Sequence, residues 1–234
     1  MAKTKKQETN SGRDLIENPD VLAGKAEEFF DSKKNQNILY GVLIGIVAIV
    51  GGFTFLRSQQ SNQNEEAQQE MFQAIYYFEA DSLGQALNGD GNNYGFLDIL
   101  DEYSGTKAAN IAAFYAGATY LKLGDYENAI RRLEDFSSDD YLLQARAYSL
   151  IGDALMELDD FDKAIRAYQK AVDYKPNKEF TPVYLQKLAI ALEESGNYAG
   201  AADAYERILE DFVSSKLEQE ARKQKARLRG LAVE

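Results

Sequence analysis

The chain has 234 residues, neither cysteine nor histidine, and a formal net charge of −12 at pH 7. The missing side chains exclude disulfides, thiol nucleophiles, imidazole bases and the usual zinc ligands. Residues 1–57 carry eight basic and seven acidic side chains, so residues 58–234 carry 18 basic and 31 acidic ones. Because such an acidic segment repels a phosphate backbone, we expect no nucleic-acid binding.

The first 37 residues are predicted to form a polar tail with a short amphipathic helix. Asn18-Pro19 ends any helix, and the residues before it are typical of a disordered segment. Residues 21–31 have apolar side chains at helical spacing, with Phe29 and Phe30 just ahead of an apolar run. This helix either lies on a membrane surface or continues into the apolar run, and the sequence favours neither.

Residues 38–56 read ILYGVLIGIVAIVGGFTFL, a segment without a charge. As a helix it extends about 28 Å, which matches the apolar core of a bilayer. Its length, the long tail ahead of it and the lack of a small-x-small cleavage site favour a retained transmembrane helix over a cleaved signal peptide. Basic residues cluster before residue 38, and after Arg57 the next one is Lys107. The positive-inside rule therefore predicts a cytoplasmic N-terminus, with residues 57–234 across the membrane.

Small residues recur on one face of the predicted transmembrane helix. They are Gly41, Gly45, Ala48 and Gly52. Small side chains allow two membrane helices to pack with their backbones close together. Glycine is also frequent in membrane helices in general. The pattern is explained either by a partner helix in the bilayer or by ordinary composition.

Residues 57–69 are rich in Gln, Asn, Ser and Glu, and form either a flexible tether or the polar start of a long helix. The domain proper is predicted over 70–234. It opens with an apolar helical stripe from Met71 that reaches about Leu87. A short helix over 96–103 completes a degenerate leading unit.

The loop over residues 88–95 faintly resembles a calcium-binding loop, with Asp90 at its first position. The final bidentate Glu of such a loop is missing, and ordinary turn chemistry explains the same residues. We therefore predict no metal site. After this loop, Thr106 is placed to cap a helix that starts at Lys107.

One short pattern occurs three times between residues 108 and 213. Each copy is a turn followed by an aromatic and a small residue: LGDYENA at 123–129, LDDFDKA at 158–164 and SGNYAGA at 195–201. Small residues also recur where two helices must approach closely, at Gly117, Gly152 and Ala189. The copies lie 35 and 37 residues apart, and the pattern resembles the tetratricopeptide repeat, whose period is about 34 residues.

This resemblance implies helix pairs stacked into a solenoid whose concave face binds partners. The predicted fold is all-α: a single N-terminal transmembrane helix followed by a tetratricopeptide-repeat α-solenoid. The repeats are placed at about 110–143, 145–178 and 182–213, and a capping helix follows at 215–231, capped by Ser214 or Ser215.

Basic residues crowd the second half of the capping helix: Arg222, Lys223, Lys225, Arg227 and Arg229. Cations near a helix C-terminus complement the helix dipole. A basic face on an acidic domain could instead dock a partner or anionic headgroups. Both interpretations remain open.

The repeat register assigns the concave face residue by residue. The predicted partner groove consists of Ile111, Phe114, Leu121, Arg146, Asp153, Met156, Glu157, Gln186, Ile190, Glu193 and Glu194. Its early part is apolar and its later part acidic, which suits an apolar, mildly basic segment. Packing against the protein's own helix at 65–87 is an equally good use of the apolar part.

The sequence contains no Gly-x-Ser-x-Gly elbow and no phosphate-binding glycine loop. We therefore expect no catalytic activity, no cofactor and no small-molecule substrate.

The whole layout resembles the YfgM family of bacterial envelope proteins: a short tail, Phe29 and Phe30 before one glycine-rich span, and a repeat domain beyond it. The resemblance implies a single-pass protein of the bacterial inner membrane with a periplasmic repeat domain. It also implies association with Sec translocon subunits and a membrane-anchored periplasmic chaperone, in assistance to exported proteins. The alternative is an envelope scaffold that organises outer-membrane protein assembly or cell division.

Overall fold

The computed structural model describes residues 30–233, and all regular structure among them is helical. The chain divides into two compact units, Met1–Gln59 and Gln60–Glu234. Most of the predicted tail, including Phe29, lies outside the described residues.

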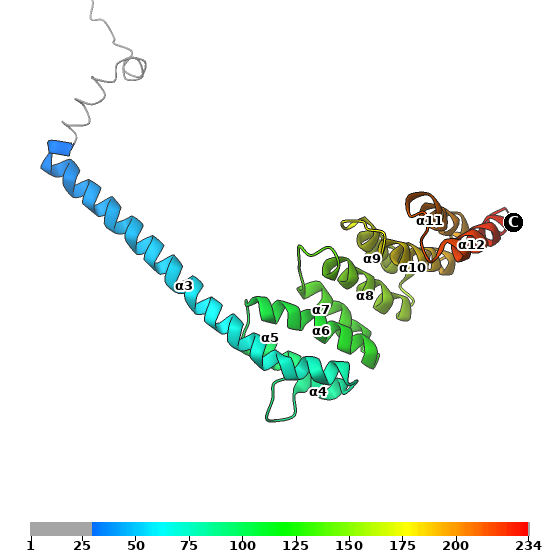
Figure 1. The fold of residues 1–234 in the computed structure, drawn as a ribbon, viewed down its shortest axis with the longest axis horizontal. Coiled ribbons are helices and arrows are strands. Elements are labelled where there is room, and N and C mark those ends of the chain that lie inside the picture. The colour runs from blue at the N-terminus through cyan, green and yellow to red at the C-terminus, as the bar shows by residue number, and fades with distance from the viewer. Residues whose placement is uncertain (1–29, 234) are drawn as a thin grey trace, which may run out of the picture. The chain divides into compact units, whose positions relative to one another are not determined.

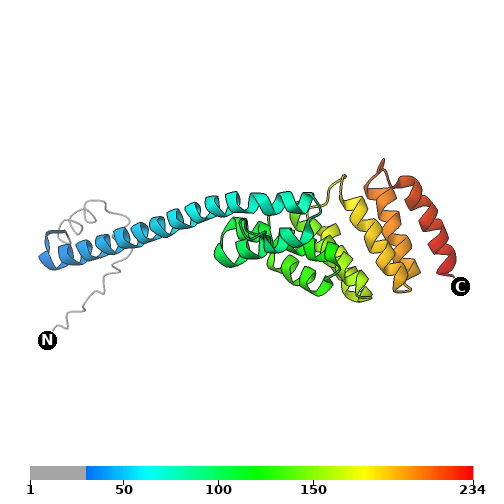
Figure 2. The same cartoon turned by 90° about the horizontal axis from the view of Figure 1, so that it is seen from below.

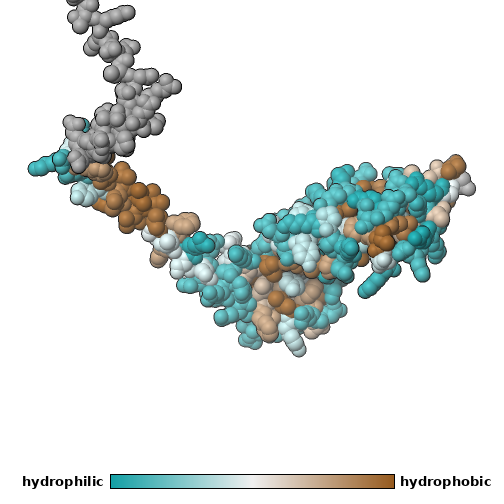
Figure 3. Space-filling model, turned by 45° about the horizontal axis from the view of Figure 1, so that its top comes forward, coloured by the Kyte–Doolittle hydropathy of each residue, from teal (hydrophilic) through white to brown (hydrophobic). Residues whose placement is uncertain are grey.

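Helix α3, Lys33–Glu79, begins in the first unit and ends in the second. Its apolar stretch is exposed, with a mean hydropathy of 2.3 over 18 residues and none of them buried. Figure 3 shows this stretch as a brown band. The helix is therefore long and apolar enough to cross a membrane, although a signal sequence near an N-terminus has the same properties. Residues 57–69 are helical throughout, which corresponds to the helix start of the two predicted forms.

The predicted helix ending near Leu87 is wrong in its extent, because α3 ends at Glu79. Asp81 takes a left-handed conformation with φ of 56°, which breaks the helix, and its short polar side chain tolerates that conformation. The Ser82 amide then donates to the Tyr77 carbonyl at 2.8 Å and closes the turn. A separate short helix, α4, follows at Leu83–Asn88.

The remaining helices follow in chain order. They are α5 (Phe96–Glu102), α6 (Lys107–Leu123), α7 (Tyr126–Asp135), α8 (Leu143–Glu157), α9 (Phe161–Asp173), α10 (Thr181–Glu194), α11 (Tyr198–Asp211) and α12 (Glu218–Leu231). Consecutive helices from α6 onward lie side by side as hairpins (Figure 1 and Figure 2). Each of the three predicted repeats is one hairpin: α6 with α7, α8 with α9, and α10 with α11.

The repeated turn works in the same way in each hairpin. Its middle residue is left-handed at Gly124, Asp159 and Gly196, with φ of 79°, 57° and 81°. The next side chain caps the second helix: Asp125, Asp160 and Asn197 each accept from the backbone amide three residues later. A glycine pays no steric cost in this conformation, and Asp tolerates it.

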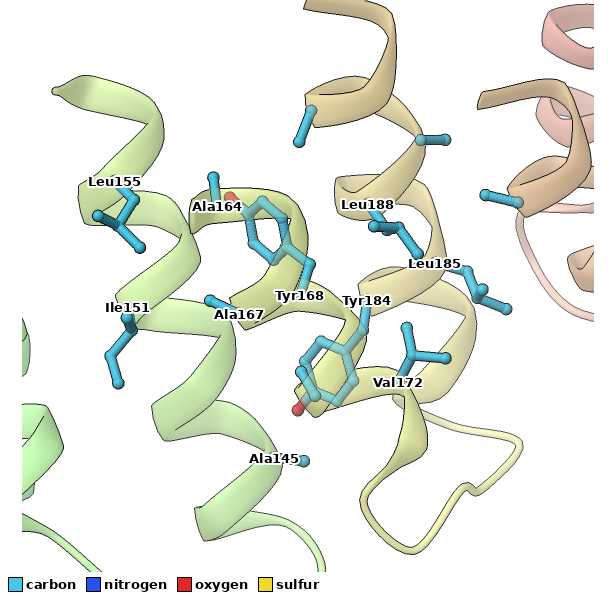
Figure 4. Close-up of a cluster of buried hydrophobic side chains, with 14 of the residues drawn as sticks. Ala145, Ile151, Leu155, Ala164, Ala167, Tyr168, Val172, Tyr184, Leu185 and Leu188 are labelled. Atoms are coloured by element: carbon cyan, nitrogen blue, oxygen red, sulfur yellow. The ribbon is translucent and has the colours of Figure 1, made fainter. Parts of the chain in front are cut away.

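Small residues let the two helices of a hairpin approach closely, as predicted. A Cβ added at Gly152 would lie 2.5 Å from Cε1 of Tyr168, and one at Gly117 would lie 2.6 Å from Cγ of Leu133. Figure 4 shows the core around Tyr168, with Ala164 and Ala167 on the same helix, α9. These side chains are almost completely buried: Ala164 is 0% exposed and Tyr168 is 3% exposed.

The sequence predicts the N-terminal cap of α6 correctly and that of α12 incorrectly. Thr106 caps α6 as predicted, because its side chain accepts from the Ala109 amide. The capping helix α12 begins at Glu218 rather than at residue 215, and no side chain caps it. Ser214 is left-handed with φ of 69°, so residues before Leu217 form a turn.

The close approach at Gly152 gives a stability prediction. Gly152→Ala should lower the free energy of unfolding of the full chain by about 1–3 kcal/mol, because the added methyl group overlaps the Tyr168 ring. The measurement is thermal or urea denaturation followed by circular dichroism. Gly230→Ala is the matched control, since nothing lies within 4 Å of a Cβ there. Equal effects of the two changes would contradict the packing described.

Candidate partner-binding site

The predicted groove residues all lie on the first helices of the three hairpins. Ile111, Phe114 and Leu121 lie on α6, the residues from Arg146 to Glu157 on α8, and those from Gln186 to Glu194 on α10. We call the surface made by these three helices on that side the groove face. The apolar part of the groove face is largely buried, whereas the acidic part is at the surface, where two of its carboxylates form ion pairs.

The apolar part is largely used inside the domain. Phe114 is 7% exposed, and its ring centroid lies 5.2 Å from that of Phe136 on the α7 side. Ile111 is half-buried and packs against two clusters of buried apolar side chains, one that extends from α6 to α12 and one formed by α3, α4, α5 and α6. Leu121 is also half-buried. Phe114 therefore belongs to the core, which leaves little of this region for a partner.

Helix α3 packs on α6 through alanines and one methionine. Ala67, Met71 and Ala74 of α3 share one cluster with Ala108, Ala112 and Ala116 of α6. The Asn64 side chain adds a hydrogen bond from the Ala108 amide at 2.9 Å. This arrangement favours the interpretation in which the chain's own N-terminal helix covers α6.

Two carboxylates of the acidic part of the groove face, those of Asp153 and Glu193, are paired with cations within the chain. Asp153 accepts from Lys187 Nζ at 2.6 Å and from the Tyr168 hydroxyl at 2.8 Å. Glu193 binds Arg227 through two hydrogen bonds of 2.8 and 2.6 Å. Both carboxylates therefore already have a cationic partner within the chain.

Both ion pairs join residues 34 apart, so each one links the first helix of a repeat to the helix one repeat later. Complementary charges at the repeat period are visible in the sequence, but the repeat register alone predicts these carboxylates as free acidic residues of the groove. Glu157 is tied in a related way, since it accepts from the Tyr126 hydroxyl at 3.1 Å.

Two pKa shifts accompany these contacts. The Arg227 guanidinium beside Glu193 lowers the pKa of that carboxyl below its ordinary value. Burial, followed by the charge of Asp153, raises the pKa of Tyr168. The Tyr168 hydroxyl, which is protonated at neutral pH even at its ordinary pKa, donates to Asp153.

The exposed side chains of the groove face lie mainly on α10 and on helix α8. Ile190 is 42% and Val183 40% exposed, and Arg146 and Glu194 are exposed as well. Gln186 and, on α8, Met156 are half-buried. Val183 and Ile190 are seven residues apart, so they lie on one side of α10.

A cleft that the sequence did not indicate opens at the start of α10. Its volume is about 540 Å³. It is lined by Pro182, Val183, Phe212, Val213, Ser214, Ser215 and Leu217, and flanked by Lys178, Glu179 and Lys216. Val213 is 68% exposed. The left-handed Ser214 makes the turn that borders this cleft, and a turn of this kind leaves no periodic pattern in the sequence.

The basic residues of α12 dock that helix onto its neighbours. Lys225 pairs with Glu206 at 2.5 Å, and Arg229 pairs with Asp203 and Glu206 at 2.6 and 3.0 Å. With the pair formed by Arg227, these contacts give the basic face a structural role through ion pairs between helices rather than through the helix dipole.

Asp90 is held by its own loop and by Tyr77 of α3. Its carboxylate accepts from the Tyr77 hydroxyl at 2.7 Å and from the amides of Asn92 and Asn93. These bonds, led by the one from Tyr77, lower the pKa of Asp90. The residues of the faint calcium pattern are thus explained by turn chemistry.

The small-residue face of the apolar stretch is open. A Cβ added at Gly41, Gly45 or Gly52 would meet nothing within 4 Å, and Ala48 is exposed. A partner helix on this face stays a prediction.

Comparison with known proteins identifies the repeats. Residues 112–139 and 143–212 match family models of the tetratricopeptide repeat. Among solved structures, the chain is similar to MamA 41-end from Desulfovibrio magneticus RS-1, with 25% identity and a TM-score of 0.50 over 62% of this chain and 74% of that one. It is also similar to a MamA RS-1 ArsTM double mutant, with 23% identity and a TM-score of 0.51 over 74% of this chain and 92% of that one.

The second likeness shows the fold alone. The prediction of tetratricopeptide repeats is confirmed, and such repeats are typically protein-interaction modules. Membership of the YfgM family stays a prediction.

The Glu193–Arg227 pair gives a prediction that depends on pH. A double-mutant cycle with Glu193→Gln and Arg227→Gln should show a coupling free energy of about 0.5 kcal/mol at pH 7. Because the pKa of Glu193 is lowered in the folded chain, this stability is present above the ordinary value of 4.5 and is lost as pH falls through the lowered pKa.

Urea denaturation of the full chain at neutral pH and at about pH 3 measures the coupling. The matched control is the cycle of Arg146→Gln and Glu194→Gln, two exposed residues of the groove face, which should show none. A coupling that persists undiminished at the lower pH would contradict the assignment.

Proposed function

We propose that this tetratricopeptide-repeat chain is a membrane-anchored interaction scaffold that works at the Sec translocon with a membrane-anchored periplasmic chaperone and assists exported proteins. The observation that carries the proposal is the apolar side of α10, where Val183 and Ile190 remain exposed while the carboxylates of Asp153 and Glu193 are paired. Such a surface suits an apolar segment held by side-chain burial.

The neighbouring groups support a segment that is apolar with a mixed polar margin. Arg146 and Glu194 are exposed on the groove face, and the cleft beside Val183 adds apolar lining from Val213. Exported chains expose apolar segments before they fold. A surface of this composition can hold such segments without selecting one sequence.

Anchoring at the inner membrane is the second part of the proposal. The apolar stretch of α3 would span the bilayer, with basic residues on its cytoplasmic side and the repeats in the periplasm. A repeat domain held there would meet chains as they leave the translocon.

The orientation gives a direct test, because the chain has no cysteine of its own. A Ser61→Cys variant should react with a membrane-impermeant maleimide in cells whose outer membrane alone is permeabilised. Ser32→Cys, on the other side of the apolar stretch, is the matched control and should react only after the inner membrane is lysed. The reverse pattern would overturn the orientation, and loss of residues before the stretch from the mature protein would overturn the anchor.

The groove face gives a second test. A photoreactive phenylalanine at Ile190 of the full-length protein in cells should crosslink to translocon or chaperone subunits, detected with antibodies against them. The same probe at Tyr141, which is similarly exposed at 49%, is the control and should not. Capture of only outer-membrane assembly or division proteins at Ile190 would instead support an envelope scaffold.

A further inference from the structure

Helix α3 has an exposed stripe in the second unit that lies outside the groove face. It consists of Glu65, Gln69, Phe72, Tyr76 and Glu79, which follow one another at spacings of four, three, four and three. This spacing places them on one side of the helix. We call it the aromatic stripe. Phe72 is 71% and Tyr76 58% exposed, more than any other aromatic side chain described in residues 60–233.

The aromatic stripe is exposed although the helix that carries it is firmly packed. The opposite side of α3 buries Ala67, Met71 and Ala74, each at most 6% exposed. The Asn64 side chain bonds the Ala108 amide, and Gln60 Nε2 donates to the Gly105 carbonyl at 2.9 Å. The stripe is thus a preformed surface, which lowers the entropy cost of binding.

The two ends of the repeat stack differ in character. Terminal repeats of a solenoid normally present a polar outer face to water. The C-terminal helix α12 exposes Arg222 and Lys223, and the apolar side chains exposed at its end, Leu231 and Val233, are aliphatic. The leading end instead exposes two aromatic rings beside a shallow hollow of about 490 Å³ along Glu65, Gln68, Gln69 and Phe72. Exposed apolar side chains within a polar rim mark interaction sites.

Charge narrows the choice of occupant. Residues 58–106 contain nine acidic side chains and no basic one. The stripe itself carries Glu65 and Glu79 at its two ends, and Glu66 and Glu70 are exposed beside it. A second copy docked by the same face would bring like charges together, which disfavours self-association. A basic partner is complementary.

We propose that the aromatic stripe docks a basic amphipathic helix of a protein partner. Its apolar side chains cover Phe72 and Tyr76, and its Lys or Arg residues pair with Glu65 and Glu79. These carboxylates are 14 residues apart, so they lie about 21 Å from each other along the helix axis. A partner helix of about 14 residues spans that length and engages both ends at once.

The test uses the full-length chain in nanodiscs of zwitterionic lipid. The probe is a fluorescent peptide of about 14 residues with Leu on one helical face and Lys on the other. Binding is followed by fluorescence anisotropy, with empty nanodiscs subtracted. The peptide should bind the wild-type chain, and Phe72→Ser with Tyr76→Ser should weaken binding about tenfold. Leu123→Ser with Tyr141→Ser, at exposed positions elsewhere, is the matched control and should leave binding unchanged.

Charge and location are tested in the same system. Glu65→Lys with Glu79→Lys should weaken binding, and a peptide with Glu in place of Lys should bind far less. A photoreactive phenylalanine at Phe72 should crosslink the Leu/Lys peptide, whereas one at Tyr141 should not. A thermal melt of each variant shows that folding is intact.

Several results overturn the proposal: no binding of the Leu/Lys peptide, equal binding of the Glu peptide, or undiminished binding by the Phe72 and Tyr76 variant. A wild-type dimer that this variant converts to a monomer would instead assign the stripe to a second copy. The Ile190 crosslinks that test the proposed function are independent of these outcomes.

Discussion

The repeat domain depends on the close approach of two helices within each hairpin. At Gly152 the backbone of α8 comes so near to α9 that the Tyr168 ring occupies the space of a side chain. The ring is buried and its hydroxyl is held by Asp153, so it cannot move aside without losing that hydrogen bond. Asp153 in turn binds Lys187 of the next hairpin. One small residue therefore connects packing within a repeat to the attachment of the following repeat.

The features that the sequence predicted well are those with a local cause. The turns at Gly124, Asp159 and Gly196 need left-handed backbone, and the residue after each one caps a helix. Thr106 follows the same local logic. Such requirements involve a few neighbouring residues, so they leave a direct record in the residue types.

The features that the sequence missed depend on the assembled stack. Phe114 reads as a groove residue in the repeat register, yet the ring of Phe136 covers it. Glu193 reads as free acidic surface, yet Arg227 arrives from a helix one repeat away. The early end of α3 also escaped prediction, because Asp81 breaks the helix without a glycine or proline at that position. Charge counting along one helix cannot show which charges meet across helices.

The ion pairs at the repeat period also bear on how the chain folds during synthesis. A hairpin that has left the ribosome contains its own helix caps and its own close contact between helices, such as the one at Gly152. It can therefore form from residues close in sequence. The carboxylate on its first helix, such as that of Asp153, then pairs with a cation of the next repeat, which is synthesised directly afterwards. We therefore expect the hairpins to assemble in order from the N-terminal to the C-terminal end, each one packing on the hairpin already folded. Helix α12 packs last.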